Sequence, residues 1–218
     1  MLKTTTARTG AALALAAFAG LASGQITLVT DARLVSGNVA TPDENDADAL
    51  TPTMFGAAMD DNIQLSALGN GAAAASGSQT SNIGADRIVG RGGASLSLNP
   101  ASVGSIASIF EIVFTLDSNA LASLSVAASA SGEADAAFIL SRQGQGTVAS
   151  GPGVFDLDLE AGTYAIRAVA QSIADASQAS APTGGAASFV FDLTIIPAPG
   201  AAGLLAGAGL FAARRRRA

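Results

Sequence analysis

Large apolar residues recur at every second position through much of the second half of this 218-residue chain. In residues 110–116 (FEIVFTL) they occupy all of the even positions, and in 155–160 (FDLDLE) they alternate strictly with acidic residues. A period of two places one side of a strand in the core and the other in water, whereas a helix needs a period near 3.6. This pattern therefore constrains the chain to half-buried β-strands. The same alternation runs through residues 124–130, 164–170 and 188–195.

Turn-forming residues separate these segments. Alanine-rich stretches would favour helix on propensity alone, but Ser and Gly are interleaved with the alanines and the apolar period remains two. The segment NGAAAASGSQTSN at 70–82 fits either a mobile loop or a strand of small residues. In the less regular first half, we expect strands at 26–29, 34–39, 63–68, 86–89 and 94–98.

The segments 155–160 and 164–170 flank a short Ala161-Gly162 turn, which predicts a tight hairpin between them. Tyr164 is in phase with the apolar residues of its own segment. We therefore expect its ring in the core and its hydroxyl near the end of the sheet.

About ten short strands separated by turns are typical of a single antiparallel β-sandwich, here jelly-roll-like. We assign the sandwich to residues 25–196, so that prolines 197 and 199 follow the last strand. The chain has no cysteine, so no disulfide contributes to its stability. All of the stability must come from the packed core.

Residues 1–24 have the layout of a secretory signal peptide. A short basic start precedes the uncharged run of residues 10–22, which is too short to span about 30 Å of hydrocarbon as an anchor. Small residues at Ala22 and Gly24 suit signal peptidase, and cleavage would leave Gln25 as the new N-terminus.

The C-terminal tail at 197–218 has three parts: two prolines flanking one residue, the uncharged run 200–213, and four consecutive arginines. A helix over the uncharged run would be only about 21 Å long. Basic residues remain on the cytoplasmic side of a membrane, so the body of the protein would lie on the other side. The motif residues are Pro197, Ala198, Pro199, Arg214, Arg215, Arg216 and Arg217.

This tripartite tail resembles the PEP-CTERM sorting signal of bacteria that make exosortase, in a Pro-Ala-Pro variant with Ala198 at the usual Glu position. The resemblance covers about 25 residues at the C-terminus. It implies transient insertion in the inner membrane, recognition by an exosortase-like processing enzyme, and delivery to the cell surface or the extracellular space. It also implies an association with exopolysaccharide or biofilm material.

Composition excludes several classes of function. Residues 25–196 contain five arginines, no lysine and all 17 acidic residues, a formal charge of −12 that disfavours binding of nucleic acid. Without His or Cys there is no Ser-His-Asp or Cys-His arrangement and no His- or Cys-ligated zinc. Asp156, Asp158 and Glu160 are expected on the solvated face of their strand. We therefore assign no catalytic residue.

Two acidic segments are expected to be loops whose oxygen atoms suit calcium, the one cofactor that we consider. The first lacks the glycine and the distal Glu of an EF-hand loop. Loops that are merely solvated are the alternative interpretation. The candidate ligands are Asp43, Asn45, Asp46, Asp48, Asp60 and Asp61.

The leading hypothesis is therefore a non-enzymatic, exported protein of the cell surface or extracellular matrix. The alternative is a glycan- or calcium-binding β-sandwich on the same export route. Sugar-binding sandwiches commonly present exposed aromatic rings, but this chain has no Trp and one Tyr. A glycan site here would have to be polar and poor in aromatic residues.

Overall fold

A computed structural model describes residues 25–69 and 71–196 of the chain. Within these ranges all regular secondary structure is β, arranged as thirteen strands in two antiparallel sheets, so the prediction of an all-β body is confirmed. No helix in the described ranges is long and apolar enough to cross a membrane. The predicted signal peptide and the predicted tail helix lie outside the described residues.

The first sheet, called sheet A here, consists of β1 (Ile26–Asp31), β2 (Leu34–Ala40), β3 (Asn45–Leu50), β7 (Val103–Leu116), β9 (Ala134–Arg142), β10 (Gly146–Ser150) and β12 (Gly162–Asp175). Its strands run in the order β10-β9-β12-β7-β2-β3. Strand β1 shares one edge of β7 with β2, because it pairs with the last residues of β7 and β2 pairs with the preceding ones.

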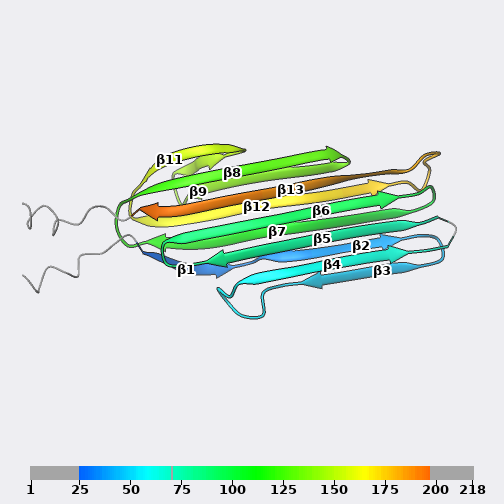
Figure 1. The fold of residues 1–218 in the computed structure, drawn as a ribbon, viewed down its shortest axis with the longest axis horizontal. Helices are drawn as coiled ribbons and strands as arrows, with labels where there is room; N and C mark the ends of the chain where they lie inside the picture. The colour runs from blue at the N-terminus through cyan, green and yellow to red at the C-terminus, as the bar shows by residue number, and fades with distance from the viewer. Residues whose placement is uncertain (1–24, 70, 197–218) are drawn as a thin grey trace, which may run out of the picture.

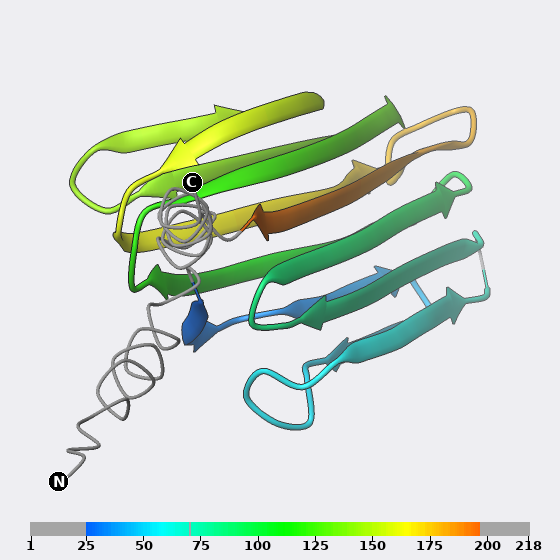
Figure 2. The ribbon, with the colours of Figure 1, turned by 60° about the vertical axis from the view of Figure 1, so that its left-hand side comes forward.

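The second sheet, sheet B, consists of β4 (Met59–Ala67), β5 (Ala73–Ile83), β6 (Arg87–Leu98), β8 (Ala120–Gly132), β11 (Gly153–Leu159) and β13 (Thr183–Ile196). Its order is β11-β8-β13-β6-β5-β4. The strands of both sheets follow the long axis of the molecule (Figure 1). An oblique view separates the two layers (Figure 2).

The last eight strands pair in nested order. β9 pairs with β10, β8 with β11, β7 with β12, and β6 with β13. This is the pattern of one long hairpin that is folded over on itself. Successive strand pairs therefore alternate between the sheets: β9–β10 and β7–β12 lie in sheet A, and β8–β11 and β6–β13 lie in sheet B. Strands β2 and β3 extend sheet A beyond β7, while β5 and β4 extend sheet B beyond β6.

The predicted hairpin through Ala161-Gly162 is wrong. Strand β11 pairs with β8 in sheet B, and β12 pairs with β7 and β9 in sheet A, so the chain crosses between the sheets at this turn. Two side chains hold the crossing, one from the β7–β8 connection and one from the end of β9. Asn119 accepts a hydrogen bond from the Ala161 amide at 2.8 Å, and Arg142 donates to the Ala161 carbonyl at 2.8 Å.

The small-residue segment at 70–82 lies largely in β5, which has β4 on one side and β6 on the other. Of the two alternatives, the strand is therefore correct. Apart from Asp86, which lies in the preceding turn, the segments 86–89 and 94–98 belong to one continuous strand, β6, because the glycines between them stay in register with both neighbouring strands.

Tyr164 lies in the core as expected, and its hydroxyl donates to the Glu160 carbonyl at 2.7 Å. Its ring stacks on Phe114 with 5.6 Å between the centroids. Burial raises the pKa of the Tyr164 phenol, so the hydroxyl stays protonated and keeps this bond.

A cluster of aromatic rings joins the two sheets. The Phe191 ring from sheet B meets Phe110 of sheet A edge-on with a centroid separation of 4.8 Å, and Phe138 of sheet A at 5.2 Å. Gly90 lies opposite Phe191 in the ladder between β6 and β13. A Cβ atom on Gly90 would lie 2.4 Å from Cε1 of Phe191, so the ring fills the space that a side chain would need.

Both ends of the described body meet at one turn. The amide of Ile26, at the start of β1, donates to the Ala85 carbonyl, and the amide of Ile195, near the end of β13, donates to the Asp86 carbonyl; both bonds are 2.7 Å long. The chain therefore enters and leaves the sandwich at the same end (Figure 1).

Replacing Gly90 with Ala should destabilise the protein by about 1–3 kcal/mol, because the added methyl group must displace the Phe191 ring from its packed position. Urea denaturation measures the change. Gly93→Ala is the matched control, since its Cβ would lie 3.3 Å from the Ser78 hydroxyl on the exposed side of the same strand. Equal effects at the two glycines would contradict this account of the core.

Candidate functional site

The two acidic segments that we predicted as loops are mostly strands, so that prediction is wrong. They form β3 and β4, the edge strands of the two sheets on one side of the sandwich. Strand β3 pairs with β2, and β4 pairs with β5. Asp43 alone lies in the bend before β3. Asn45, Asp46 and Asp48 lie in β3, and Asp60 and Asp61 lie in β4.

Carboxylates on this side of the sandwich bind backbone and side-chain donors of sheet B. The Asp46 carboxylate accepts the Ser66 amide at 3.0 Å, and the Glu44 carboxylate accepts the Leu68 amide at 2.7 Å. Both amides lie at or just beyond the end of β4, so the two side chains cap its outer edge. In the described ranges, no three His, Cys, Asp or Glu side chains form a group that could hold a metal ion.

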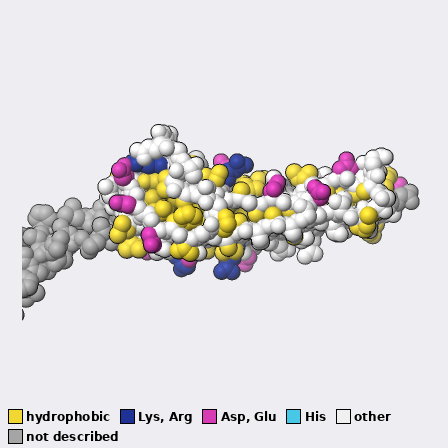
Figure 3. All heavy atoms as spheres, turned by 90° about the horizontal axis from the view of Figure 1, so that it is seen from above, with side chains coloured by type: hydrophobic (Ala, Val, Ile, Leu, Met, Phe, Trp, Pro, Cys, Tyr) yellow, Lys and Arg dark blue, Asp and Glu magenta, His cyan; other side chains and the backbone are white. Residues whose placement is uncertain are grey.

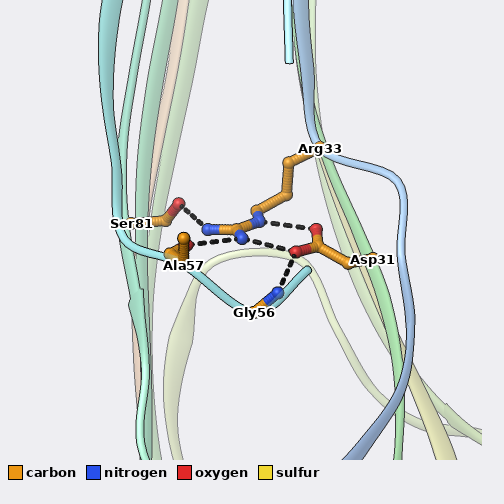
Figure 4. Close-up of polar contacts among 5 residues, drawn as sticks. All are labelled: Asp31, Arg33, Gly56, Ala57 and Ser81. Carbon is orange, nitrogen blue, oxygen red and sulfur yellow. Dashed lines mark hydrogen bonds and ion pairs between the residues drawn. The ribbon is translucent and has the colours of Figure 1, made fainter. Parts of the chain in front are cut away.

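A buried ion pair that the sequence analysis did not single out joins β1 to the loop before β4 (Figure 4). The Arg33 guanidinium donates to the Asp31 carboxylate through Nε at 2.7 Å and Nη2 at 2.5 Å. It also donates to the Ala57 carbonyl at 2.6 Å and the Ser81 hydroxyl at 2.8 Å. The Gly56 amide completes the network with a 2.9 Å bond to Asp31.

This network is enclosed, because the side chains of Arg33 and Asp31 are 0% and 2% exposed. Burial alone would raise the pKa of Asp31, but the hydrogen bonds from Arg33 and Gly56 outweigh it and lower that pKa. The pair therefore holds the 51–58 loop against the sandwich and offers nothing to an outside ligand. Its signal in the sequence is slight: opposite charges two residues apart between two apolar strands.

Other buried polar groups are also sealed. Both amide atoms of Gln79 and the Ser108 hydroxyl lack a hydrogen-bond partner among the described residues. Gln79 pairs with Gly92 across the β5–β6 ladder, and a Cβ on Gly92 would lie 2.3 Å from the Ser108 oxygen. These groups lie between the sheets, so the candidate surfaces are the two outer faces.

The outer face of sheet B carries rows of small polar side chains in register across four strands. One row runs from Asn62 through Ser78 and Gly93 to Ser188. Shallow hollows lie along these rows, and one of them has a volume of about 340 Å³. The polar side chains that line this hollow and the adjacent one are Asn62, Gln64, Ser66, Ser76, Ser78, Ser95 and Ser97.

Arg91 lies on the same face, between Thr80 and Val190 of the neighbouring strands, and its side chain is exposed. It makes no ion pair or hydrogen bond with any residue that the structure describes. The other four arginines of the described body each pair with a carboxylate. On this face Arg87 binds Asp192 at 2.5 Å and lowers its pKa. Arg91 is therefore available to an anionic or hydroxyl-rich ligand.

The predicted processing residues cannot be placed in the same way. Ala22, Gly24 and the whole sorting motif lie outside the described residues, and Gln25 begins the described body. Asp156 and Asp158 point to solvent from β11, as expected, and Glu160 follows at the crossing between the sheets.

No protein-family model matches the chain, and neither curated proteins nor solved structures gave a match.

Removing the guanidinium of Arg33 should cost about 3–5 kcal/mol, because Asp31 would be left charged and buried without its partner. The variants are Arg33→Met alone and together with Asp31→Asn, which should recover part of the loss. Arg87→Met is the control, since its pair with Asp192 is exposed and screened by solvent, so its loss should change stability little. Thermal and urea unfolding measure the differences.

The same pair predicts a dependence on pH. The folded-state pKa of Asp31 lies below its ordinary value of 3.8. The stabilisation is therefore complete above that ordinary value and is lost as the pH falls through the folded-state pKa. The gap in stability between wild type and Arg33→Met should narrow in acid, and a constant gap would contradict the role of the ionised pair.

Proposed function

We propose that this protein is exported and sorted by an exosortase-type enzyme to the cell surface or extracellular matrix, where it acts without catalysis. The observation that carries the proposal is the order of proline motif, short apolar run and arginine cluster at the C-terminus, together with an N-terminal signal-like segment. The meeting of both body ends at the Gly84–Asp86 turn fits attachment through one end.

We also infer that the body is jelly-roll-like. The nested pairing of β6 to β13 supports this, because in a jelly roll the first strand pairs with the last and each inner pair follows in turn. Strands β1–β5 would then be an N-terminal extension that widens both sheets.

For the exported body, the best candidate role is contact with extracellular polysaccharide through the outer face of sheet B. Rows of hydroxyl and amide groups present donors and acceptors at the regular spacing of strands, about 4.8 Å. Arg91 adds to this face a cation that has no ion-pair partner in the described part of the chain. Without aromatic rings each contact would be weak, and binding would depend on many contacts along a polymer.

The export proposal predicts the mass of the mature protein. Material recovered from the surface of the producing cell should start at Gln25 and lack Arg214 to Arg217, because the signal peptide and the sorting tail are removed. Intact-mass analysis decides this. Replacing the four arginines with neutral residues should make the unprocessed precursor accumulate, whereas wild-type protein that retains them would identify the tail as a simple anchor.

The polysaccharide proposal predicts binding that depends on Arg91. On a glycan array, Arg91→Gln should weaken binding to carboxylate-bearing chains by about tenfold, since a charge-assisted hydrogen bond is lost. Arg167→Gln on sheet A is the matched control, because it removes the same charge from the opposite outer face. Equal losses, or no binding at all, would contradict a site on sheet B.

The same array with added calcium and with a chelator tests the calcium-dependent alternative. Binding that requires calcium and is lost in Asp46→Asn would favour that alternative over direct contact with sheet B.

A further inference from the structure

Among the described strands, β3 and β10 end sheet A, and β4 and β11 end sheet B. Strand β1, which pairs with β7 alone, adds a further free side in sheet A, and its register shifts between Leu28 and Thr30. An edge strand exposes unpaired backbone groups that can accept another strand, and proteins commonly block them with charges, bulges, short strands or covering segments. Acidic residues lie on β3, β4 and β11, and β10 is short and irregular, so these edges differ chiefly in how well their large apolar side chains are covered.

On one side of the sandwich, Asp46 and Glu44 cap the end of β4, and the inward apolar side chains of β4 are buried despite its edge position. The neighbouring edge, β3, carries Asp46 and Asp48 within six residues. On the other side, β10 has only five residues and its register shifts between Thr147 and Ala149.

Strand β11 differs from the other three. Like β3 it carries two acidic residues, Asp156 and Asp158, but it is longer, contains no proline and pairs with β8 without a register shift from Gly153 to Leu159. No described residue outside β8 donates to or accepts from its backbone. The edge is also apolar: Val154 is 77% exposed, and Phe155 and Leu157 are only partly buried although they face the core.

The space-filling view along this side shows hydrophobic atoms gathered over the surface where β10 and β11 form the edges (Figure 3). At β4, in contrast, the corresponding inward residues, such as Ile63 and Leu65, are almost completely covered. One more strand beside β11 would cover Phe155 and Leu157 in the same way. Sheet B is therefore incomplete on this side in both its backbone pairing and its core.

We propose that the free edge of β11 binds an extended polypeptide segment of another protein as an added strand. Backbone hydrogen bonds would supply general affinity, and alternate side chains would supply specificity. The inward positions of the added strand need apolar residues to cover Phe155 and Leu157. Its outward positions lie beside Asp156 and Asp158, so they need Lys or Arg. The occupant is a segment that alternates apolar and basic residues.

A second copy of β11 does not meet this requirement. When two copies pair in antiparallel fashion about Leu157, Asp156 of each lies opposite Asp158 of the other, and like charges directly opposite each other are destabilising. A slip of two residues, which centres the pairing on Asp156, places two Asp156 carboxylates opposite each other. The acidic row therefore excludes self-pairing in these registers and selects a basic partner.

The probe is a synthetic peptide of alternating Val and Arg, about ten residues long, with blocked ends. It is titrated into the purified full-length protein and binding is followed by fluorescence anisotropy. The control peptide has the same composition but N-methylated backbone amides on alternate residues, which removes the strand's hydrogen bonds and keeps its charge. We expect saturable binding of the first peptide and at least about tenfold weaker binding of the second.

Two charge-matched variants locate the site. Asp156→Lys with Asp158→Lys should abolish binding, whereas Asp135→Lys with Asp175→Lys, at exposed positions on sheet A, should leave it intact. Amide hydrogen exchange of the complex should slow in β11 and not in β4. Equal binding of both peptides, equal loss in both variants, or protection elsewhere would overturn the proposal, as would dimerisation of the free protein through β11.

This site is independent of the proposed export role. If the tail proved to be a simple anchor, the proposal of peptide binding at β11 would be unaffected. If the peptide failed to bind, correct processing of the tail would not support the β11 proposal.

Discussion

The contact of Phe191 with Phe110 and Phe138 is the interaction on which the rest of the structure depends, because it joins sheet B to sheet A near the middle of the sandwich. The chain has no cysteine, so no covalent link supports this contact. It is made possible by Gly90, whose missing side chain leaves room for the ring within its own sheet. Large rings opposite glycines thus let a chain rich in small residues build a closely packed interior.

The alternation of apolar residues predicted the long central strands β7 and β12, but it did not indicate β3, β9 or β10. It could not predict which sheet a strand enters. The Ala161-Gly162 turn has the composition of a hairpin, yet the partners of β11 and β12 lie elsewhere in the chain. Local sequence specifies that the chain turns there, and distant pairing decides where it goes.

The acidic residues were harder to interpret from sequence, because identical side chains do different things in different places. Asp31 is buried and ionised beside Arg33, Asp46 caps a backbone amide at a sheet edge, and Asp156 faces solvent. Net charge and spacing do not distinguish these roles. The same holds for arginine: Arg33 is paired with Asp31, whereas Arg91 has no carboxylate partner among residues 25–69 and 71–196.

The two ends of the body, at Ile26 and Ile195, are fastened to one turn at one end of the sandwich. The longest strands have 14 residues, which corresponds to about 45 Å. Any attachment through either end would therefore hold the opposite end of the body about 45 Å from the point of anchorage. The outer faces and the β11 edge would then run away from the anchorage, so that they would be accessible along their length except near the anchored end.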